Sequence, residues 1–283
     1  MSGSAAADVV VEVLRAGPAR KDKSCKGVIV FLHGWPDTNA LWKNQVDFFT
    51  KHKYHCACLS LPSYSGYDSS HKWALDFPDV RDVLIRQIKE VNDGKPVHVV
   101  AHDWGAVFAY MIERKAPELV KTLSTIDVGG RIHIASVAGK VLVPAYQLWL
   151  SSAFVLGNVV PVVGKPIGDL MTRLCAKYFA HSPSFSADHG SHVNYPYFYF
   201  YKGLFLGGSG GTNYLKHYSP QRPTFYSYGA AKPFMFHSDG WLKEMDRRED
   251  CQVQAFPCGH WVQVDQGEAL NHAILKFITT HSA

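Results

Sequence analysis

The stretch of sequence that decides the fold runs from an apolar segment into a helical one, and reads Val97-His98-Val99-Val100-Ala101-His102-Asp103-Trp104-Gly105-Ala106. Val97–Ala101 is predicted to be a short buried strand, and Ala106–Lys115 a helix that ends before Pro117. Small residues flank Asp103, and a sharp strand-to-helix turn needs them because its central residue takes a strained backbone conformation. Such a turn holds the Asp103 side chain above the sheet and points the backbone N–H of Trp104 at the same place.

Strands and helices alternate on both sides of this turn. Val28–Leu32 is a continuous apolar run, as expected of a strand buried on both faces. The other predicted strands are Val9–Leu14, His55–Leu61, Lys121–Val128, Thr224–Tyr228 and Val253–Phe256, and the other predicted helices are Asn39–Lys51, Val80–Val91 and Ala269–Thr279. Repeated strand–helix units predict a mostly parallel sheet with helices on both faces.

The middle of the chain has a different pattern. Residues 129–220 contain helical segments, many aromatic residues and glycine-rich breaks, with no clear strand. We therefore expect one core domain made of residues 1–128 and 221–283, with residues 129–220 inserted as a helical cap. The glycine-rich run Gly207–Gly211 is interpreted as a flexible lid loop within that cap.

Composition excludes several classes of protein. The 283 residues are 47% hydrophobic and 19% charged, which suits a large buried core and not a disordered chain. The formal net charge is +5 without an arginine- or lysine-rich stripe, so no nucleic-acid partner is expected. The apolar segment 137–163 is interrupted by Lys140, Pro144 and Pro161, which argues against a membrane span. Six cysteines without a CxxC spacing, and no signal peptide in view, suggest reduced thiols and a cytoplasmic protein.

An aspartate at the tip of the turn indicates a particular chemistry. A carboxylate can displace a leaving group from a saturated carbon and form an alkyl ester on the enzyme. It is a poor choice for ordinary ester or amide cleavage. The alternative is that Asp103 merely caps the following helix.

Three motifs occur together and in a characteristic order: His33-Gly34-Trp35-Pro36, the turn at 101–106, and Gly259-His260-Trp261. With these motifs the chain resembles the branch of the α/β-hydrolase fold family that contains epoxide hydrolases and haloalkane dehalogenases, over about Val9 to Ile278. The resemblance implies an α/β-hydrolase fold with a covalent ester intermediate on Asp103. It also implies an oxyanion site made by the backbone N–H groups of Trp35 and Trp104. His260, on a loop after the last strand, would activate the water that hydrolyses the ester.

The acid that orients His260 departs from the usual pattern. Much of this family carries it in a Gly-x-x-Asp turn after the penultimate strand, but here that position holds Lys232. A second position known in the family is the end of the strand that follows the nucleophile helix, where this chain has Asp127. Its carboxylate could accept a hydrogen bond from His260 and stabilise the imidazolium. Asp239 is the alternative acid, and capping of the next helix is the alternative role for Asp127.

Aromatic residues of the predicted cap are candidates for substrate contact. The family's epoxide hydrolases use cap tyrosines to protonate the ring oxygen; Tyr201, followed by Lys202, and Tyr146 are the candidates here, with Tyr199 beside them. Core packing is the alternative role of such an aromatic run. A halide leaving group would need N–H donors instead, and Trp149 is the only tryptophan of the cap.

Three functions remain open at this stage. The abundance of tyrosines, and Trp35 where a dehalogenase would place Asn, favour a hydrolase that opens an epoxide to a diol. A haloalkane dehalogenase with the same Asp–His pair is second, and a non-catalytic ligand-binding protein third. The expected partner is a small apolar or amphipathic molecule. No cofactor is expected, and no metal, because no His, Cys or Asp cluster has ligand spacing. The oligomeric state does not follow from the sequence.

Overall fold

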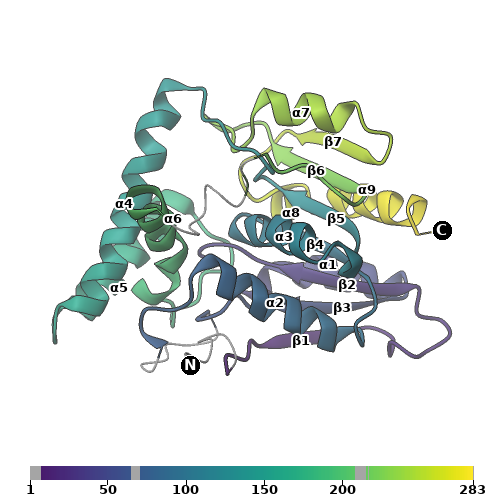
Figure 1. The fold of residues 1–283 in the computed structure, drawn as a ribbon, viewed down its shortest axis with the longest axis horizontal. Coiled ribbons are helices and arrows are strands. Elements are labelled where there is room, and N and C mark those ends of the chain that lie inside the picture. The colour runs from purple at the N-terminus through teal and green to yellow at the C-terminus, as the bar shows by residue number, and fades with distance from the viewer. Residues whose placement is uncertain (1–7, 65–70, 208–214, 216, 283) are drawn as a thin grey trace.

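The computed structural model describes residues 8–64, 71–207, 215 and 217–282. Within these residues a seven-stranded sheet has the order β1-β3-β2-β4-β5-β6-β7, and every neighbouring pair is parallel except β1 and β3 (Figure 1). The strands are β1 (Val13–Ala16), β2 (Gly27–Leu32), β3 (Tyr54–Leu59), β4 (Val97–His102), β5 (Val120–Ile126), β6 (Thr224–Gly229) and β7 (Cys251–Phe256). The mostly parallel sheet expected from the sequence is confirmed.

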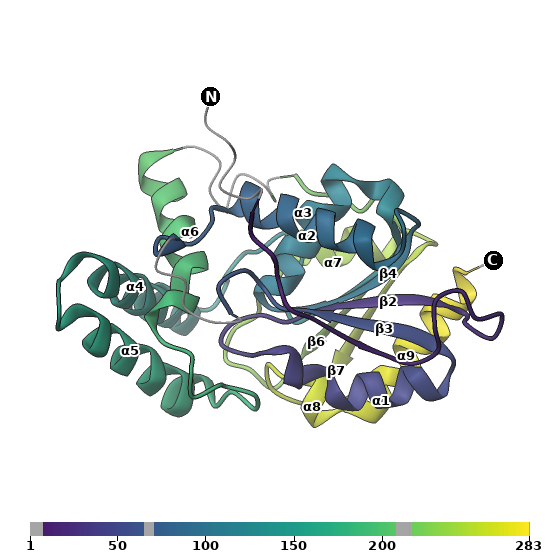
Figure 2. The same cartoon turned by 90° about the horizontal axis from the view of Figure 1, so that it is seen from below.

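Helices cover both faces of the sheet (Figure 2). One layer consists of α1 (Lys43–Lys51), α8 (Val262–Asp265) and α9 (Gly267–Thr280), and the other of α2 (Phe77–Val91), α3 (Trp104–Lys115) and α7 (Asp239–Asp246). Side chains of β2 alternate between the layers, because successive residues of a strand point to opposite faces. Val30 and Leu32 belong to the core on the α2–α3 side, and Ile29 and Phe31 to the core on the α1–α9 side.

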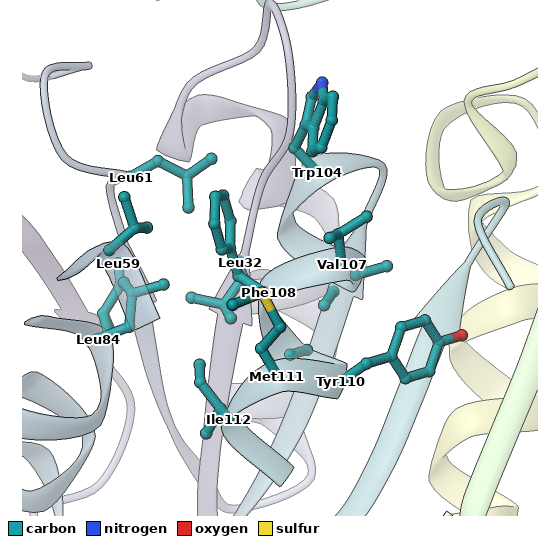
Figure 3. Packing of buried hydrophobic residues seen from close by; sticks show 14 of the residues in the cluster. Leu32, Leu59, Leu61, Leu84, Trp104, Val107, Phe108, Tyr110, Met111 and Ile112 are labelled. Atoms are coloured by element: carbon teal, nitrogen blue, oxygen red, sulfur yellow. The ribbon is translucent and has the colours of Figure 1, made fainter. Parts of the chain in front are cut away.

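The α3 helix is the centre of the larger core (Figure 3). Its residues from Trp104 to Glu113 are all buried, since the helix is enclosed by the sheet, by α2 and by the segment that follows β5. Phe108 and Met111 pack there with Leu32 of β2. Full burial of a side chain such as Phe108 stabilises the fold by about 1.5–3 kcal/mol, and the turn at the start of α3 is anchored accordingly.

A group of helices lies between β5 and β6 in the sequence. They are α4 (Val137–Val159), α5 (Gly164–Leu174), a π-helical turn η4 (Cys175–Ala180), a 3-10 turn η5 (Ser191–Asn194) and α6 (Tyr195–Leu206). Figures 1 and 2 place α4, α5 and α6 together on one side of the sheet. Within the described residues, α4 included, no helix combines the length and apolar character that a membrane crossing requires.

Some predicted boundaries were wrong. The first strand was expected at Val9–Leu14 but is Val13–Ala16, because pairing begins only where β3 lies alongside. The helix expected from Val80 begins at Phe77, where the Asp76 side chain accepts the first free N–H. Residues 39–42 form a separate 3-10 turn η1 (Asn39–Trp42) ahead of α1, and a second one, η3 (Pro117–Leu119), follows α3. The proposed lid loop, residues 207–211, lies outside the described residues after Gly207.

Candidate active site

Asp103 occupies a strained turn between β4 and α3. Its backbone has φ +53° and ψ −123°, a region that residues with a side chain rarely adopt. Two glycines make this geometry possible. A Cβ at Gly34 would overlap the Asp103 carboxylate, and one at Gly105 would overlap the backbone of Leu32 and His33. Gly105, one of the small residues predicted around the turn, is therefore required by the close approach of the backbone after β2.

The Asp103 carboxylate is held from the side of β2. The backbone N–H of Trp35 donates to Oδ1 at 2.8 Å, and the backbone N–H of Trp104 also stabilises the charged form. The carboxylate does not cap α3 through a side-chain hydrogen bond. Burial raises the pKa of Asp103, and this effect exceeds the lowering by His260 and the two backbone N–H groups. Oδ2 is the oxygen that faces His260.

His260 lies between two carboxylates. Its Nε2 is 3.7 Å from Oδ2 of Asp103, and its Nδ1 lies 2.5 Å from Oδ2 of Asp127. Burial lowers the pKa of His260, but the charges of Asp127 and Asp103 outweigh burial, so the pKa is raised. The geometry places a proton on Nδ1 and leaves Nε2 to face Asp103.

The acid beside His260 is Asp127. It follows β5 directly, is fully buried, and accepts a 3.1 Å hydrogen bond from the backbone N–H of Gly229 through Oδ1. Burial raises the pKa of Asp127, but His260 and Lys232 together outweigh that effect and lower it. Asp239, the alternative acid, is the first residue of α7, and none of the contacts described joins it to His260.

Lys232 forms an ion pair with Asp127, a contact that the sequence did not predict. It follows β6, at the position where the family usually carries the acid, and its ammonium group forms an ion pair with Oδ1 of Asp127. Its side chain is only 9% exposed. Asp127 therefore binds a histidine with one oxygen and a lysine with the other.

Two neighbouring residues complete the setting of His260. His102, at the end of β4, packs under the His260 ring at 4.4 Å between centroids, and its Nε2–H donates to the His260 carbonyl at 3.1 Å. Burial lowers the pKa of His102 strongly, so it is neutral.

Asp37 accepts from the indole N–H of Trp261 and from the hydroxyls of Ser182 and Ser184, which links the loop before α1 to the loop after η4. Neither role is visible in a sequence, because both depend on loops that meet only in space.

Two cavities meet at Asp103. The larger has a volume of about 440 Å³ and the smaller about 290 Å³. Both are lined by Asp103, Tyr146, Tyr197 and Phe236, and the smaller one also reaches His260. The remaining walls are mainly aliphatic and aromatic, which suits an apolar or amphipathic molecule.

The structure selects among the tyrosines. Tyr146, on α4, lines both cavities, as does Tyr197 on α6, which was not among the predicted site residues; their rings are 6.0 Å apart. Burial raises the pKa of both phenols, and the Asp103 charge raises it further. Tyr201 and Tyr199 line neither cavity. Their hydroxyls donate to Gln147 Oε1 at 3.3 Å and to the Trp73 carbonyl at 3.1 Å.

Tyr197 and Tyr201 are one helical turn apart in the same aromatic run. The motif match at Tyr201-Lys202 favoured Tyr201, whereas Tyr197 is the one of the two that lines the cavities. The signal that could have pointed to Tyr197 is its place directly after Pro196, in the first turn of the helix. That turn packs next to Trp104 and Trp35, whose rings lie 5.3 and 5.6 Å from the Tyr197 ring.

The indole N–H groups near the site already have acceptors. That of Trp104 bonds the Tyr197 hydroxyl, and that of Trp35 donates to Asn194 Oδ1 at 2.8 Å. Trp149 is 46% exposed, donates to the Met171 carbonyl at 3.1 Å and lines neither of the two cavities. Among the described residues no group of three or more His, Cys, Asp or Glu side chains converges to hold a metal ion.

Comparison with known proteins gives a consistent result. The model of the alpha/beta hydrolase family matches residues 29–273. Mouse epoxide hydrolase 4 is 24% identical over 275 residues, which cover 89% of this chain and 73% of that protein. The first curated relatives match over shorter stretches, which span only 19% to 43% of those proteins.

Solved structures share the fold at low identity. The epoxide hydrolase of Bacillus megaterium, solved with an inhibitor, superimposes with a TM-score of 0.62 at 18% identity, covering 95% of this chain and 96% of that one. A loop variant of the haloalkane dehalogenase DbeA of Bradyrhizobium elkanii gives 0.65 at 19% identity, covering 95% and 93%. Both kinds of enzyme therefore share this architecture, and overall similarity does not separate them.

Proposed function

This chain belongs to the alpha/beta hydrolase family, and from that premise we propose that it is an epoxide hydrolase which forms a covalent ester on Asp103. Residues 129–220 act as the cap over the site. The substrate is a small apolar or amphipathic epoxide, because aliphatic and aromatic side chains dominate the walls of both cavities.

The single observation that carries this proposal is the pair of tyrosines opposite Asp103. Tyr146 and Tyr197 share both cavities with that carboxylate. Because their pKa values are raised, both phenols stay protonated and can donate at neutral pH. An epoxide has no good leaving group until its oxygen is protonated, so a proton donor opposite the nucleophile is what this reaction requires.

In the first step Asp103 opens the ring. Oδ1 is engaged by the Trp35 N–H, so Oδ2 attacks the epoxide carbon. A carbon–oxygen bond forms, the ring carbon–oxygen bond breaks, and its electron pair goes to the ring oxygen. That oxygen takes a proton from Tyr146 or Tyr197, which leaves a hydroxyalkyl ester on Asp103.

In the second step His260 hydrolyses the ester. Ester formation removes the negative charge of Asp103, one of the charges that raise the pKa of His260. The pKa of His260 therefore falls in the intermediate, when the histidine must act as a base. His260 Nε2 takes a proton from water, and the hydroxide attacks the ester carbonyl. The oxyanion accepts from the N–H groups of Trp35 and Trp104. Its collapse breaks the ester bond to the alkyl oxygen, and the departing alkoxide takes the proton back from His260 and leaves as the diol. The proton of the Asp103 carboxylic acid then returns to the tyrosine. Asp127 stabilises the imidazolium.

The hydrogen bonds that the tryptophan indole N–H groups already make argue against a halide leaving group. A dehalogenase needs free N–H donors at the leaving group, but those of Trp104, Trp35 and Trp149 already have acceptors. The same Asp–His pair could perform that displacement, so the dehalogenase remains the alternative that the test must separate.

The test is the intact mass of a His260→Gln variant exposed to an epoxide panel and to a bromoalkane panel. Without the base the ester accumulates. A gain equal to a whole epoxide, mapped to Asp103 and absent from an Asp103→Asn, His260→Gln double variant, is the expected result. A gain equal to an alkyl group with release of bromide would make the protein a dehalogenase. No adduct from either panel would contradict the nucleophile role of Asp103.

A further inference from the structure

The outer surface of α4 and α5 is unusually apolar. Exposed hydrophobic residues are spaced by three, four or seven positions along each helix, so they lie on one face of it. They are Val137, Val141 and Leu148 on α4, and Ile167, Leu170 and Leu174 on α5, each between 40% and 80% exposed. We call these six residues, with Trp149, the outer cap face.

The two helices present one continuous surface. They pack side by side over much of their length, as Figures 1 and 2 show. The indole N–H of Trp149 donates to the Met171 carbonyl of α5 across the seam, while its ring remains 46% exposed. Soluble proteins expose apolar residues singly, whereas a contiguous patch of this kind marks a surface that binds something.

The net positive charge of the cap indicates what kind of partner the outer cap face binds. Residues 129–220 contain seven Lys or Arg and two Asp, a net charge of +5, which equals the formal net charge of the whole chain. The rest of the protein is therefore balanced. Of the two acids, Asp169 is engaged by Lys165 at 2.6 Å and by the Ser191 hydroxyl at 2.9 Å. Lys140 on α4 and Lys177 in η4 are exposed and flank the apolar residues.

An apolar helical face bordered by lysines, with acids nearly absent, is the pattern of helices that lie in the interface of a negatively charged bilayer. We propose that the outer cap face docks this protein on the surface of an anionic phospholipid membrane. The apolar side chains enter the boundary of the acyl chains, and the lysines contact the headgroup phosphates. The helices lie along the membrane and do not cross it.

The docking surface leads to the candidate active site. Leu142 of α4 and Phe179 of η4 are 40% and 48% exposed, and both line the smaller cavity beside Asp103 and His260. A lipophilic epoxide dissolved in the bilayer would thus enter the site along an apolar path. This extension rests on the proposed function, whereas the docking itself does not.

The experiment is flotation of the full chain with vesicles of phosphatidylcholine alone and of phosphatidylcholine mixed with phosphatidylserine. Wild type should float with the mixed vesicles and much less with the neutral ones. A Leu148→Gln, Leu170→Gln double variant should bind the mixed vesicles about tenfold less. Its control is Val10→Gln, Leu14→Gln, which changes two exposed apolar residues in and just before β1.

Lysine variants test the electrostatic part. Lys140→Gln and Lys177→Gln should each reduce binding to the mixed vesicles about fivefold and leave binding to neutral vesicles unchanged. Lys95→Gln, which changes an exposed lysine in the turn before β4, is the control and should have no effect. High salt should reduce wild-type binding in the same direction.

Three outcomes would overturn the proposal. The wild type could fail to bind either type of vesicle, or the Val10→Gln, Leu14→Gln control could weaken binding as much as the Leu148→Gln, Leu170→Gln variant. Analytical ultracentrifugation could also show a wild-type dimer that the Leu148→Gln, Leu170→Gln variant no longer forms. The last would assign the outer cap face to a second copy of the chain. The His260→Gln variant should float like wild type. Failure of the proposed chemistry would leave flotation intact, so the two proposals fail separately.

Discussion

Lys232 pairs through its ammonium group with Oδ1 of Asp127, the carboxylate whose Oδ2 binds Nδ1 of His260. The acid that binds His260, Asp127, directly follows β5. Lys232 follows β6, at the position where related hydrolases usually carry that acid. The Lys232 charge lowers the pKa of His260, against the raising effects of Asp127 and Asp103. Lys232 thus limits how strongly His260, the proposed base, is protonated.

Removing that cation should shift the pH dependence of turnover. In Lys232→Met the pKa of His260 rises, because one of the effects that lower it is lost. A base works only above its pKa, so the acidic limb of the kcat profile moves to higher pH. Lys232→Arg keeps the charge and should retain the wild-type limb. The rate of ester formation, measured by intact mass in a single turnover, should change much less than kcat. A Lys232→Met profile that coincides with wild type would contradict this role.

The choice between the two candidate acids can be tested directly. Asp127→Asn should reduce turnover by about 10⁴-fold, because the carboxylate that orients His260 and stabilises its cation is lost. The ester should accumulate in this variant, as it does without the base. Asp239→Asn is the matched control and should retain wild-type kcat, since none of the described contacts joins Asp239, the first residue of α7, to His260. Equal losses in both variants would show that the acid was assigned wrongly.

The cap tyrosines make a second matched set. Tyr146→Phe and Tyr197→Phe should each slow ester formation by about 10²-fold, because the ring oxygen loses a proton donor while the apolar wall is kept. Tyr201→Phe and Tyr199→Phe remove hydroxyls that bond elsewhere and should have little effect. Single-turnover kinetics with an epoxide in the His260→Gln background isolates this step. Full activity of both Tyr146→Phe and Tyr197→Phe would contradict the assignment of these tyrosines as proton donors.

Gly34 should tolerate no side chain. In Gly34→Ala the new Cβ would overlap the Asp103 carboxylate, so the nucleophile must shift. A displacement of about 1 Å costs about 10²-fold in the rate of ester formation. Gly240→Ala is the control, because the nearest atom to a Cβ there is 3.9 Å away. Circular dichroism melting should show both variants folded, and an unaltered ester rate in Gly34→Ala would disprove the steric argument.

The charged Asp103 carboxylate should lower the free energy of unfolding at neutral pH. Burial raises its pKa above the unfolded value, and a group shifted in this way contributes stability at low pH that is lost as the pH rises through the folded pKa. Asp103→Asn should therefore be more stable than wild type at pH 7, although it is inactive. The difference should shrink as the pH falls towards about 4, the ordinary value for Asp. Chemical denaturation at several pH values measures this, and a constant difference would contradict the electrostatic cause.

Much of this protein could be predicted from local sequence. The apolar run Val28–Leu32 indicates a buried strand because burial on both faces leaves no alternation. The turn at 101–106 is equally local, since a strained residue between strand and helix needs small neighbours at fixed offsets. Boundaries such as those of β1 were less accurate, because pairing with β3 and not periodicity decides where that strand begins.

The sequence by itself thus determined the α/β-hydrolase core, the turn that carries Asp103 and the loop that carries His260, because short-range chemistry specifies each of them. Only the tertiary structure decided which acid binds His260, which group Lys232 pairs with and which tyrosines line the cavities at Asp103. Asp127 and Lys232 meet His260 because β5, β6 and β7 end side by side. Tyr197, in the first turn of α6, lines the cavities at Asp103, whereas Tyr201, one turn further along, does not. Such relations depend on how distant segments pack, and no spacing along the chain encodes them.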